Sequence, residues 1–307
     1  MLYFWILFNL VAVVLLGLDL YVFHRPGRSV KFRSAVAYSL MWIGLAAAFA
    51  VLLHFWQGSR AALEFVTGYV VELSLSVDNL FLFLVIFRYF AVPERQQHHV
   101  LFWGIVGALI LRGLFIGVGI GLIEHFHWIF YLFGALLIYS GIRLAIIGEH
   151  QVEPAKNPVV GLVRRWLPIT NEYHDSKFFV RNASGAALCA TPLLLVLIVI
   201  ETTDLLFAID SIPAVLGITL NAFIVYTSNV LAIIGLRSLY FVAAGLMDKF
   251  RYLHHGLAVV LVLIGAKMLA EDYYPVSTGL TLGMVGGVLA MSVLASVAIP
   301  DARGSSR

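Results

Sequence analysis

The stretch GYVVELSLSVDNLFLF, residues 68–83, places charged and polar side chains where an apolar span is expected. Glu72, Asp78 and Asn79 lie inside a run long enough to cross a bilayer, which takes about 20 mostly apolar residues. A carboxylate near the centre of a membrane helix costs about 2.5–3.5 kcal/mol on insertion scales. The stretch therefore predicts buried acids that some positive partner has to compensate.

A second copy of this pattern follows later in the chain. The segment VELSLSVDN lies over TDLLFAIDS at one constant offset of 132 residues. The two copies resemble each other in the placement of charge more than in identity. The chain is therefore predicted to be built twice around buried acids. The aligned pairs are Glu72 with Asp204, Asp78 with Asp210, and Asn79 with Ser211.

The composition is that of an integral membrane protein. Of the 307 residues, 61% are hydrophobic and 12% are charged, whereas a soluble domain has about 25% charged residues. The net charge of +3 is explained by basic loops at a membrane, so we expect the lipid bilayer and no nucleic acid as a partner. Cys189 is the single cysteine, which excludes an intramolecular disulfide and a thiolate metal cluster. Any metal would be bound by oxygen atoms.

The length requirement for a span finds nine candidates and predicts an all-α, polytopic membrane protein. The first apolar run has no basic segment before it, so we expect a retained helix rather than a signal peptide. The one long connection, residues 149–186, is too polar to span. The predicted spans are residues 2–23, 35–55, 63–89, 99–122, 127–148, 187–216, 221–246, 253–271 and 277–299.

Basic residues gather in alternate connections, which predicts an orientation. Lys and Arg are enriched in cytoplasmic loops, and here the first, third, fifth and seventh connections carry them. The N-terminus is therefore predicted to lie outside and the C-terminus in the cytoplasm. The basic residues are Arg25, Arg28, Lys31 and Arg33, then Arg88 and Arg95, then Lys156, Arg164, Arg165, Lys177 and Arg181, then Lys249 and Arg251.

The repeat extends beyond the acids. Arg112 matches Arg237 at an offset of 125, and Gly141 matches Gly265 at an offset of 124. Each unit then has three spans, an odd number, so the second unit must be inverted in the membrane. Inverted repeats with polar groups at their interface are typical of transporters. We predict one transmembrane domain over residues 1–307, divided into two N-terminal helices (1–58), repeat 1 (60–150), a cytoplasmic loop (151–186), repeat 2 (187–275), and a last helix with the C-terminal tail (276–307).

Five carboxylates in the spans would cost on the order of 10 kcal/mol if they were ionised and unpaired. Arg112 and Arg237 are able to pair with two of them in a static network. Because three acids then stay unmatched, a bound cation is the favoured interpretation. Carboxylate, amide and hydroxyl oxygens suit Mg²⁺, Ca²⁺ or Mn²⁺. The candidate metal ligands are Glu72, Asp78, Asn79, Glu201, Asp204, Asp210 and Ser211.

A straight helix does not aim all of these ligands at one ion. Glu72 and Asn79 share a face, whereas Asp78 lies about 120° away from Glu72 around the helix. We therefore expect both motif helices to unwind or kink, with Pro213 as one cause in the second. Asp19, near the cytoplasmic end of the first span, is expected to be an interfacial or packing residue.

The same residues resemble a known family. The stretches GYVVELSLSVDNLFLF, ATPLLLVLIVIETTDLLFAIDSIPAVLGIT and YTSNVLAIIGLRSLYF are similar to those of the TerC family of bacterial membrane proteins, named for tellurite resistance and including the Alx proteins. The resemblance covers nearly the whole chain. It implies an inner-membrane transporter of divalent metal, with manganese export as the activity and a wider similarity to LysE-type carriers, and it carries the metal site onto the same seven residues. Family patterns often have a basic residue after the first glutamate, whereas this chain has Leu73.

We therefore expect a carrier that exports Mn²⁺ from the cytoplasm, with Ca²⁺ as the alternative ion, no organic cofactor and no enzymatic activity. Excess negative charge at the site favours exchange of the metal for protons or another cation. Two other functions stay open: a membrane factor that binds an ion and loads it onto other proteins without net transport, and a static charge network in a tellurite or stress-resistance complex. The sequence indicates neither an oligomeric state nor a protein partner.

Overall fold

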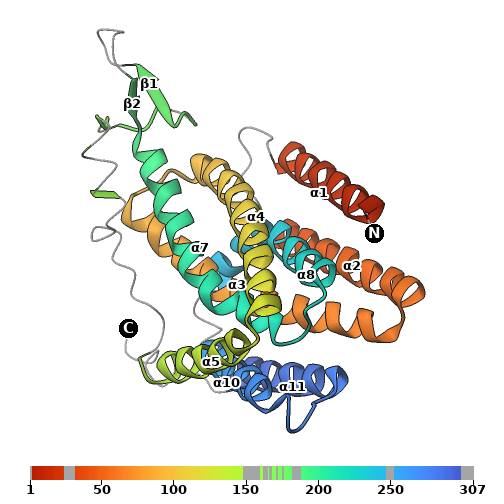
Figure 1. The fold of residues 1–307 in the computed structure, drawn as a ribbon. Coiled ribbons are helices and arrows are strands. Elements are labelled where there is room, and N and C mark those ends of the chain that lie inside the picture. The colour runs from red at the N-terminus through yellow and green to blue at the C-terminus, as the bar shows by residue number, and fades with distance from the viewer. Residues whose placement is uncertain are drawn as a thin grey trace.

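The computed structural model shows a chain dominated by long helices (Figure 1). The side chains of Asp19 and Asp78, on α1 and α3, lie outside the described part, as do most of the basic loop residues on which the predicted orientation rests. The elements are α1 (Leu2–Phe23), α2 (Phe32–Gln57), α3 (Ser59–Tyr89), α4 (Glu94–His125), α5 (Trp128–Ile147), β1 (Phe179–Arg181), β2 (Leu188–Ala190), α7 (Pro192–Leu216), α8 (Ala222–Ile234), α9 (Leu236–Leu246), α10 (Leu253–Ala270) and α11 (Thr278–Ala298). The structure describes residues 2–23, 32–147, 160–161, 165, 168–170, 172–174, 176–181, 188–246 and 252–298.

Each of the nine predicted spans corresponds to a helix or, for the seventh, to the pair α8 and α9. Within the described residues, seven helices are long and apolar enough to cross a membrane, and eight if the bent pair α8 and α9 counts as one span. Helix α1 adds a shorter apolar helix over Tyr3–Leu18. The chain is therefore a multi-pass, all-α membrane protein, as predicted.

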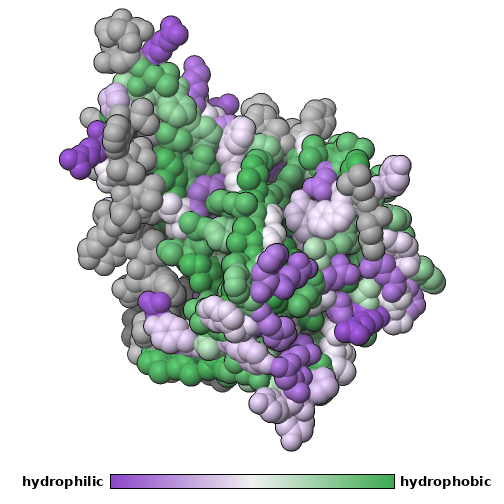
Figure 2. Space-filling model, in the orientation of Figure 1, coloured by the Kyte–Doolittle hydropathy of each residue, from purple (hydrophilic) through white to green (hydrophobic). Residues whose placement is uncertain are grey.

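Helix α4 shows why these helices suit a bilayer. Ile110, Leu114 and Val118 lie four residues apart on one face and are exposed by 68%, 61% and 50%. Arg112 and Ile116, on the opposite face, are buried. Hydrophobic side chains also cover much of the face seen in Figure 2. An apolar outer face around a buried charge is the arrangement that lipid favours, because the charge then faces the interior of the bundle.

A two-stranded antiparallel hairpin, β1 and β2, lies at the start of α7 and was not predicted. The sixth span was predicted from residue 187, but α7 begins at Pro192 because the residues before it belong to the hairpin. Proline suits the first turn of a helix, where its missing N–H needs no partner. The hydroxyl of Thr191 donates to the Lys177 carbonyl at 2.8 Å. The long connection thus contains a folded element tied to α7.

Helices α3 and α7 run through both acidic motifs without a break, so the predicted unwinding is wrong. Pro213 lies inside α7 and removes one backbone donor, yet the helix continues for three more residues. Polar side chains near the second motif bond their own backbone, as Thr203 does to the Val199 carbonyl at 2.7 Å. The physical reason is that a side chain of α4 reaches the acids, so no helical carbonyl has to be freed to complete the site.

The helical structure breaks instead in the seventh predicted span. Helices α8 and α9 meet at Gly235 with a bend of 45°. The hydroxyl of Ser238 donates to the Gly235 carbonyl at 2.8 Å, which satisfies a backbone acceptor at the bend. Trp42 of α2 packs against the same glycine, 3.4 Å from where a Cβ atom would lie. The bend comes two residues before Arg237 and therefore helps to set the position of that side chain.

The helix packing follows the predicted repeat. Helix α3 packs on α8, and α7 packs on α4, so each motif helix contacts the second helix of the other unit. Helices α5 and α10, the third helices of the two units, pack on each other, and α3 contacts α7 near the middle of the bundle (Figure 1). Exchanging the two units maps this set of helix pairs onto itself, which is what a two-fold related repeat requires.

Close contacts between α5 and α10 also come in a pair that the repeat relates. A Cβ atom on Gly265 would lie 2.6 Å from the Gly134 carbonyl oxygen, and one on Gly141 would lie 2.7 Å from the Ala258 carbonyl oxygen. The offset of 124 that pairs Gly141 with Gly265 also pairs Gly134 with Ala258, so the repeat exchanges the two contacts. Along the contact, the residue numbers rise on α5 from Gly134 to Gly141 while they fall on α10 from Gly265 to Ala258. The helices are therefore antiparallel, as equivalent helices of inverted units must be.

We expect Gly265→Ala to destabilise the protein by about 1–3 kcal/mol, because the added methyl group would overlap a backbone oxygen of α5. Gly283→Ala on α11 is the control, since no atom lies within 4 Å of its Cβ position. Thermal unfolding of the two variants in detergent measures the difference. Equal unfolding temperatures would contradict close packing of α5 on α10.

Candidate ion-binding site

A buried arginine lies between the two acidic motifs. Arg112 of α4 is 1% exposed, and its guanidinium pairs with Glu72 of α3 and with Asp204 of α7, at 3.3 Å from Asp204 Oδ1. It also donates to Ser211 Oγ at 3.2 Å and to Asn229 Oδ1 at 3.1 Å. Side chains from α3, α4, α7 and α8 therefore meet at one point inside the bundle. We call these five residues the acid centre: Glu72, Arg112, Asp204, Ser211 and Asn229.

Helical spacing explains which motif residues reach the acid centre. Asp204 and Ser211 are seven residues apart, about two turns, and so lie on one face of α7. Glu72 is fully buried, and Ser76, one turn later on α3, donates its hydroxyl to Glu72 Oε1 at 3.3 Å. Because Glu72 and Asp204 are aligned residues of the two copies, the acid centre lies where the two units meet.

The contacts with Arg112 do not satisfy every polar atom. Glu72 Oε2 and Asp204 Oδ2 are buried without a hydrogen-bond partner among the described residues, and so is Nδ2 of Asn79. A buried carboxylate oxygen without a partner carries a desolvation cost that is not offset. These two oxygens are therefore positions where a cation, a proton or a water molecule would be stabilised.

Glu201 does not join the acid centre, although it lies only three residues before Asp204. Its carboxylate lies against Gly107 of α4, where a Cβ atom would overlap Glu201 Oε1. Its Oε2 is buried without a hydrogen-bond partner in the described part of the chain. The absence of a side chain at position 107 is what makes room for this carboxylate.

Asp210 lies apart from the other acids as well. Ser140 of α5 donates to Asp210 Oδ1 at 2.6 Å, and Asp210 is half-buried. The seven predicted ligands therefore do not converge in this conformation. Among the described residues, which leave out the side chain of Asp78, no three carboxylate, imidazole or thiol groups are close enough to hold a metal ion.

Two contacts in this region were not predicted from the sequence, those of Asn229 and Ser140. Asn229 is an amide inside the apolar run YTSNVLAII, and a buried polar group in a span usually has a partner, which is the signal that identifies it. Arg112 was matched with one acid, as Arg237 was, whereas it contacts both Glu72 and Asp204. Ion pairing thus accounts for more of the buried charge than the sequence suggested.

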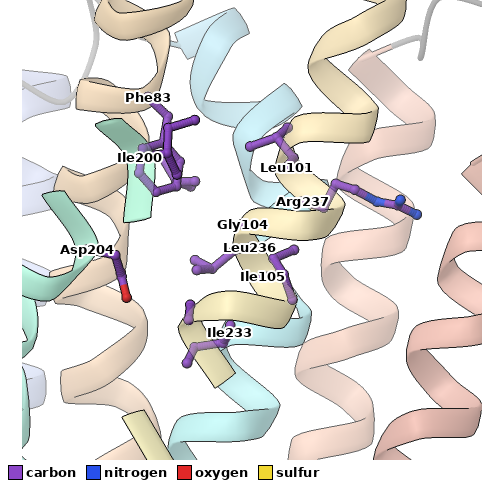
Figure 3. A pocket seen from close by; sticks show the side chains of 11 residues that line it. Phe83, Leu101, Gly104, Ile105, Ile200, Asp204, Ile233, Leu236 and Arg237 are labelled. Carbon is purple, nitrogen blue, oxygen red and sulfur yellow. The ribbon is translucent and has the colours of Figure 1, made fainter. Parts of the chain in front are cut away.

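A cavity of about 20 Å³ lies beside the acid centre, room for about one water molecule. Asp204 and Arg237 line it together with apolar side chains of α3, α4, α7 and α8 (Figure 3). In that view the guanidinium of Arg237 points away from Asp204. Arg237 is buried like Arg112, yet it lies outside the acid centre.

We expect Glu72→Gln to lower the free energy of unfolding of the ion-free protein by about 1–2 kcal/mol, because the amide makes a weaker hydrogen bond to Arg112, which keeps Asp204 as its charged partner. Glu124→Gln, exposed near the end of α4, is the matched control and should change it by less than about 0.5 kcal/mol. Denaturant unfolding in detergent with a chelator present checks this. Equal losses in the two variants would show that the pair does not stabilise the fold.

Known proteins are similar to this chain along nearly its whole length. The model of the integral membrane protein TerC family matches residues 57–303, which contain both motif helices and the acid centre. An uncharacterized membrane protein of Myxococcus xanthus is 41% identical over 293 residues, covering 95% of this chain and 91% of that protein. A protein of Escherichia coli K12 named "Putative membrane-bound redox modulator Alx" is 41% identical over 298 residues, with 94% and 92% covered.

A more distant relative, an uncharacterized membrane protein of Rickettsia bellii, is 35% identical over 293 residues and covers 95% of this chain and 96% of its own. No solved structure matches the chain. The relatives are similar along nearly their full length, and the family match includes every helix from α3 to α11. The chain therefore belongs to the TerC family of integral membrane proteins.

Proposed function

We propose that this chain is a carrier of divalent cations that exports Mn²⁺ from the cytoplasm. The observation that supports it is that Glu72 and Asp204, equivalent acids of the two units, share one positive charge where the units meet. Alternating access needs a site to which both units contribute, because rocking one unit against the other then opens the same acids to either side.

The chemistry of the acid centre favours a hard cation. Its acceptor atoms are carboxylate, hydroxyl and amide oxygens of Glu72, Asp204, Ser211 and Asn229. Such a set suits Mn²⁺, Mg²⁺ or Ca²⁺ better than a soft ion such as copper(I). The choice of Mn²⁺ among them comes from the resemblance to the TerC family. The ion is the cargo of the protein and not a resident cofactor.

The remaining acids are assigned to the path of the ion. Glu201 and Asp210 lie on α7 before and after Asp204. Glu201 lies against Gly107, and Asp210 accepts a hydrogen bond from Ser140. Asp78 is the repeat counterpart of Asp210. Carboxylates at these places lower the energy of a cation that approaches or leaves the acid centre. Their excess negative charge favours exchange of the metal for protons or another cation.

We place the carrier in a bacterial inner membrane, with the N-terminus outside and the C-terminus in the cytoplasm. The alternate basic connections support this orientation. Arg88 at the end of α3 and Arg181 of the hairpin would then face the cytoplasm.

One observation favours a second candidate, in which the acids serve a static network or bind an ion without transport. Arg112 already pairs with two carboxylates, and its single positive charge offsets one of the two negative charges, so part of the buried charge needs no metal. In this case the protein would bind no ion, or would hold one for delivery to other proteins. A measurement of metal flux across a membrane distinguishes the carrier from this second candidate, which would move no ion.

Uptake of Mn²⁺ into proteoliposomes tests the proposal. We expect saturable uptake by the natural chain, its loss in Glu72→Gln and in Asp204→Asn, and normal uptake by Glu124→Gln, whose carboxylate is exposed and outside the acid centre. Mg²⁺, Ca²⁺ and Zn²⁺ are offered separately to establish selectivity. Ion binding without flux would favour the loading factor, and neither binding nor flux would favour the static network.

Gly107→Ala tests the part played by Glu201. The added methyl group would displace the flexible end of the Glu201 side chain without touching backbone, so the protein should fold normally. We expect the half-saturating Mn²⁺ concentration to rise roughly tenfold, which corresponds to about 1.4 kcal/mol of binding. Gly117→Ala on the same helix is the control, because nothing lies within 4 Å of its Cβ position. Equal transport by both variants would remove Glu201 from the ion path.

A further inference from the structure

The two arginines that the repeat makes equivalent lie in different surroundings. Arg112 is in the acid centre and contacts an acid of each unit. Arg237 is also buried, but its guanidinium points away from Asp204 across the cavity that both residues line (Figure 3). A repeat-related pair in unlike surroundings is what one of two exchanged arrangements would show.

The partners of the second arrangement follow from the repeat offsets. The partners of Arg112 include Glu72, Asp204 and Ser211. Exchanging the units turns Arg112 into Arg237, interchanges the two acids, and turns Ser211 into Asn79. In the exchanged arrangement, Arg237 would therefore lie between the same two acids and donate a hydrogen bond to the amide oxygen of Asn79.

Asn79 is prepared for this second arrangement. It is 3% exposed, and its amide nitrogen has no hydrogen-bond partner among the described residues. The amide nitrogen is a hydrogen-bond donor, so in the second arrangement it would donate to a carboxylate of the acid centre, and only the amide oxygen could accept from Arg237. The cavity that Asp204 and Arg237 both line separates the two side chains by a space for about one water molecule.

Electrostatics favours positive charge at the acid centre in every state, either from a cation or from protons bound to the carboxylates. Two carboxylates in the low-dielectric interior of the bundle are too costly to leave without positive charge. Arg112 already contacts both of them, so a metal ion bound between the acids would have to displace its guanidinium. The arginine and the metal are therefore alternative occupants of the same place.

We propose that Arg112 is the counter-cation of the empty carrier, displaced when the metal binds, and that Arg237 replaces it at the acid centre when the empty carrier faces the other side of the membrane. The proposal rests on the proposed function, because it concerns how the carrier returns without cargo. It makes Arg112 and Arg237 positioning residues that are needed for the return of the empty carrier and not for carrying the metal.

The test compares two kinds of flux in proteoliposomes. Net uptake of labelled Mn²⁺ into ion-free vesicles requires the empty carrier to return, whereas exchange into vesicles preloaded with Mn²⁺ does not. For Arg112→Gln we expect net uptake to fall roughly tenfold or more with exchange retained, and the half-saturating Mn²⁺ concentration to fall, because the guanidinium that competes with the metal is gone. Arg237→Gln should show the same separation of net uptake from exchange.

Matched variants control for charge and folding. Arg143→Gln removes an exposed arginine of α5 and should leave both fluxes unchanged. Arg112→Lys keeps the positive charge and should keep net uptake, and retained exchange shows that each variant is folded. If Arg112→Gln does not accumulate in the membrane, Arg112→Lys provides the test. Mn²⁺ exchange without net uptake in Arg112→Lys would show that a positive charge at position 112 is not sufficient for the return of the empty carrier, against the proposal.

Three results would overturn the inference. Parallel loss of net uptake and exchange in Arg112→Gln, at an unchanged half-saturating concentration, would give Arg112 a structural role. Normal net uptake by Arg112→Gln would show that the empty carrier needs no arginine. If Arg237→Gln transports Mn²⁺ as Arg143→Gln does, Arg237 does not replace Arg112 at the acid centre. In all three, transport by the natural chain would leave the proposed function standing, whereas absence of any ion flux in the natural chain would refute that function first.

Discussion

The interior of this protein depends on one electrostatic constraint, that a carboxylate inside a membrane bundle needs positive charge beside it. Arg112 supplies that charge to Glu72 and Asp204, which lie on different helices of different units. One side chain therefore joins α3, α4 and α7, and its hydrogen bond to Asn229 adds α8. Because compensation comes from a side chain, the motif helices keep their backbone hydrogen bonds and stay helical through the acids.

The rest of the bundle is arranged so that these helices approach closely. Glycines provide the approach at α5 and α10, where Gly134 and Gly265 bring backbone against backbone. Lipid does not drive helices together through the hydrophobic effect, so close packing and polar contacts have to do it. The acid centre and the glycine contacts thus hold the two units together at separate points. Both involve residues that the repeat relates to each other.

Much of the fold was predictable from the sequence, because the bilayer leaves few alternatives. A run of apolar residues of sufficient length has to become a helix that satisfies its own backbone, and all nine runs did so. The start of α7 was misplaced by five residues because the strand Leu188–Ala190 is apolar enough to pass as the start of a span. The unwinding of α3 and α7 was wrong because helical spacing alone does not reveal a compensating charge on a third helix. The bend at Gly235 was missed for a similar reason, since its cause includes Trp42 of α2.

The sequence by itself determined the membrane class, the spans and the repeat, since each depends on which residues follow one another. It also identified Glu72, Asp204 and Ser211 as residues of one site. Only the tertiary structure decided that Glu201 and Asp210 lie elsewhere, and that Arg112 rather than Arg237 occupies the acid centre. The physical reason is that the repeat relates Arg112 and Arg237 by their places in the sequence, whereas contacts between distant helices decide which of the two guanidiniums lies between the acids.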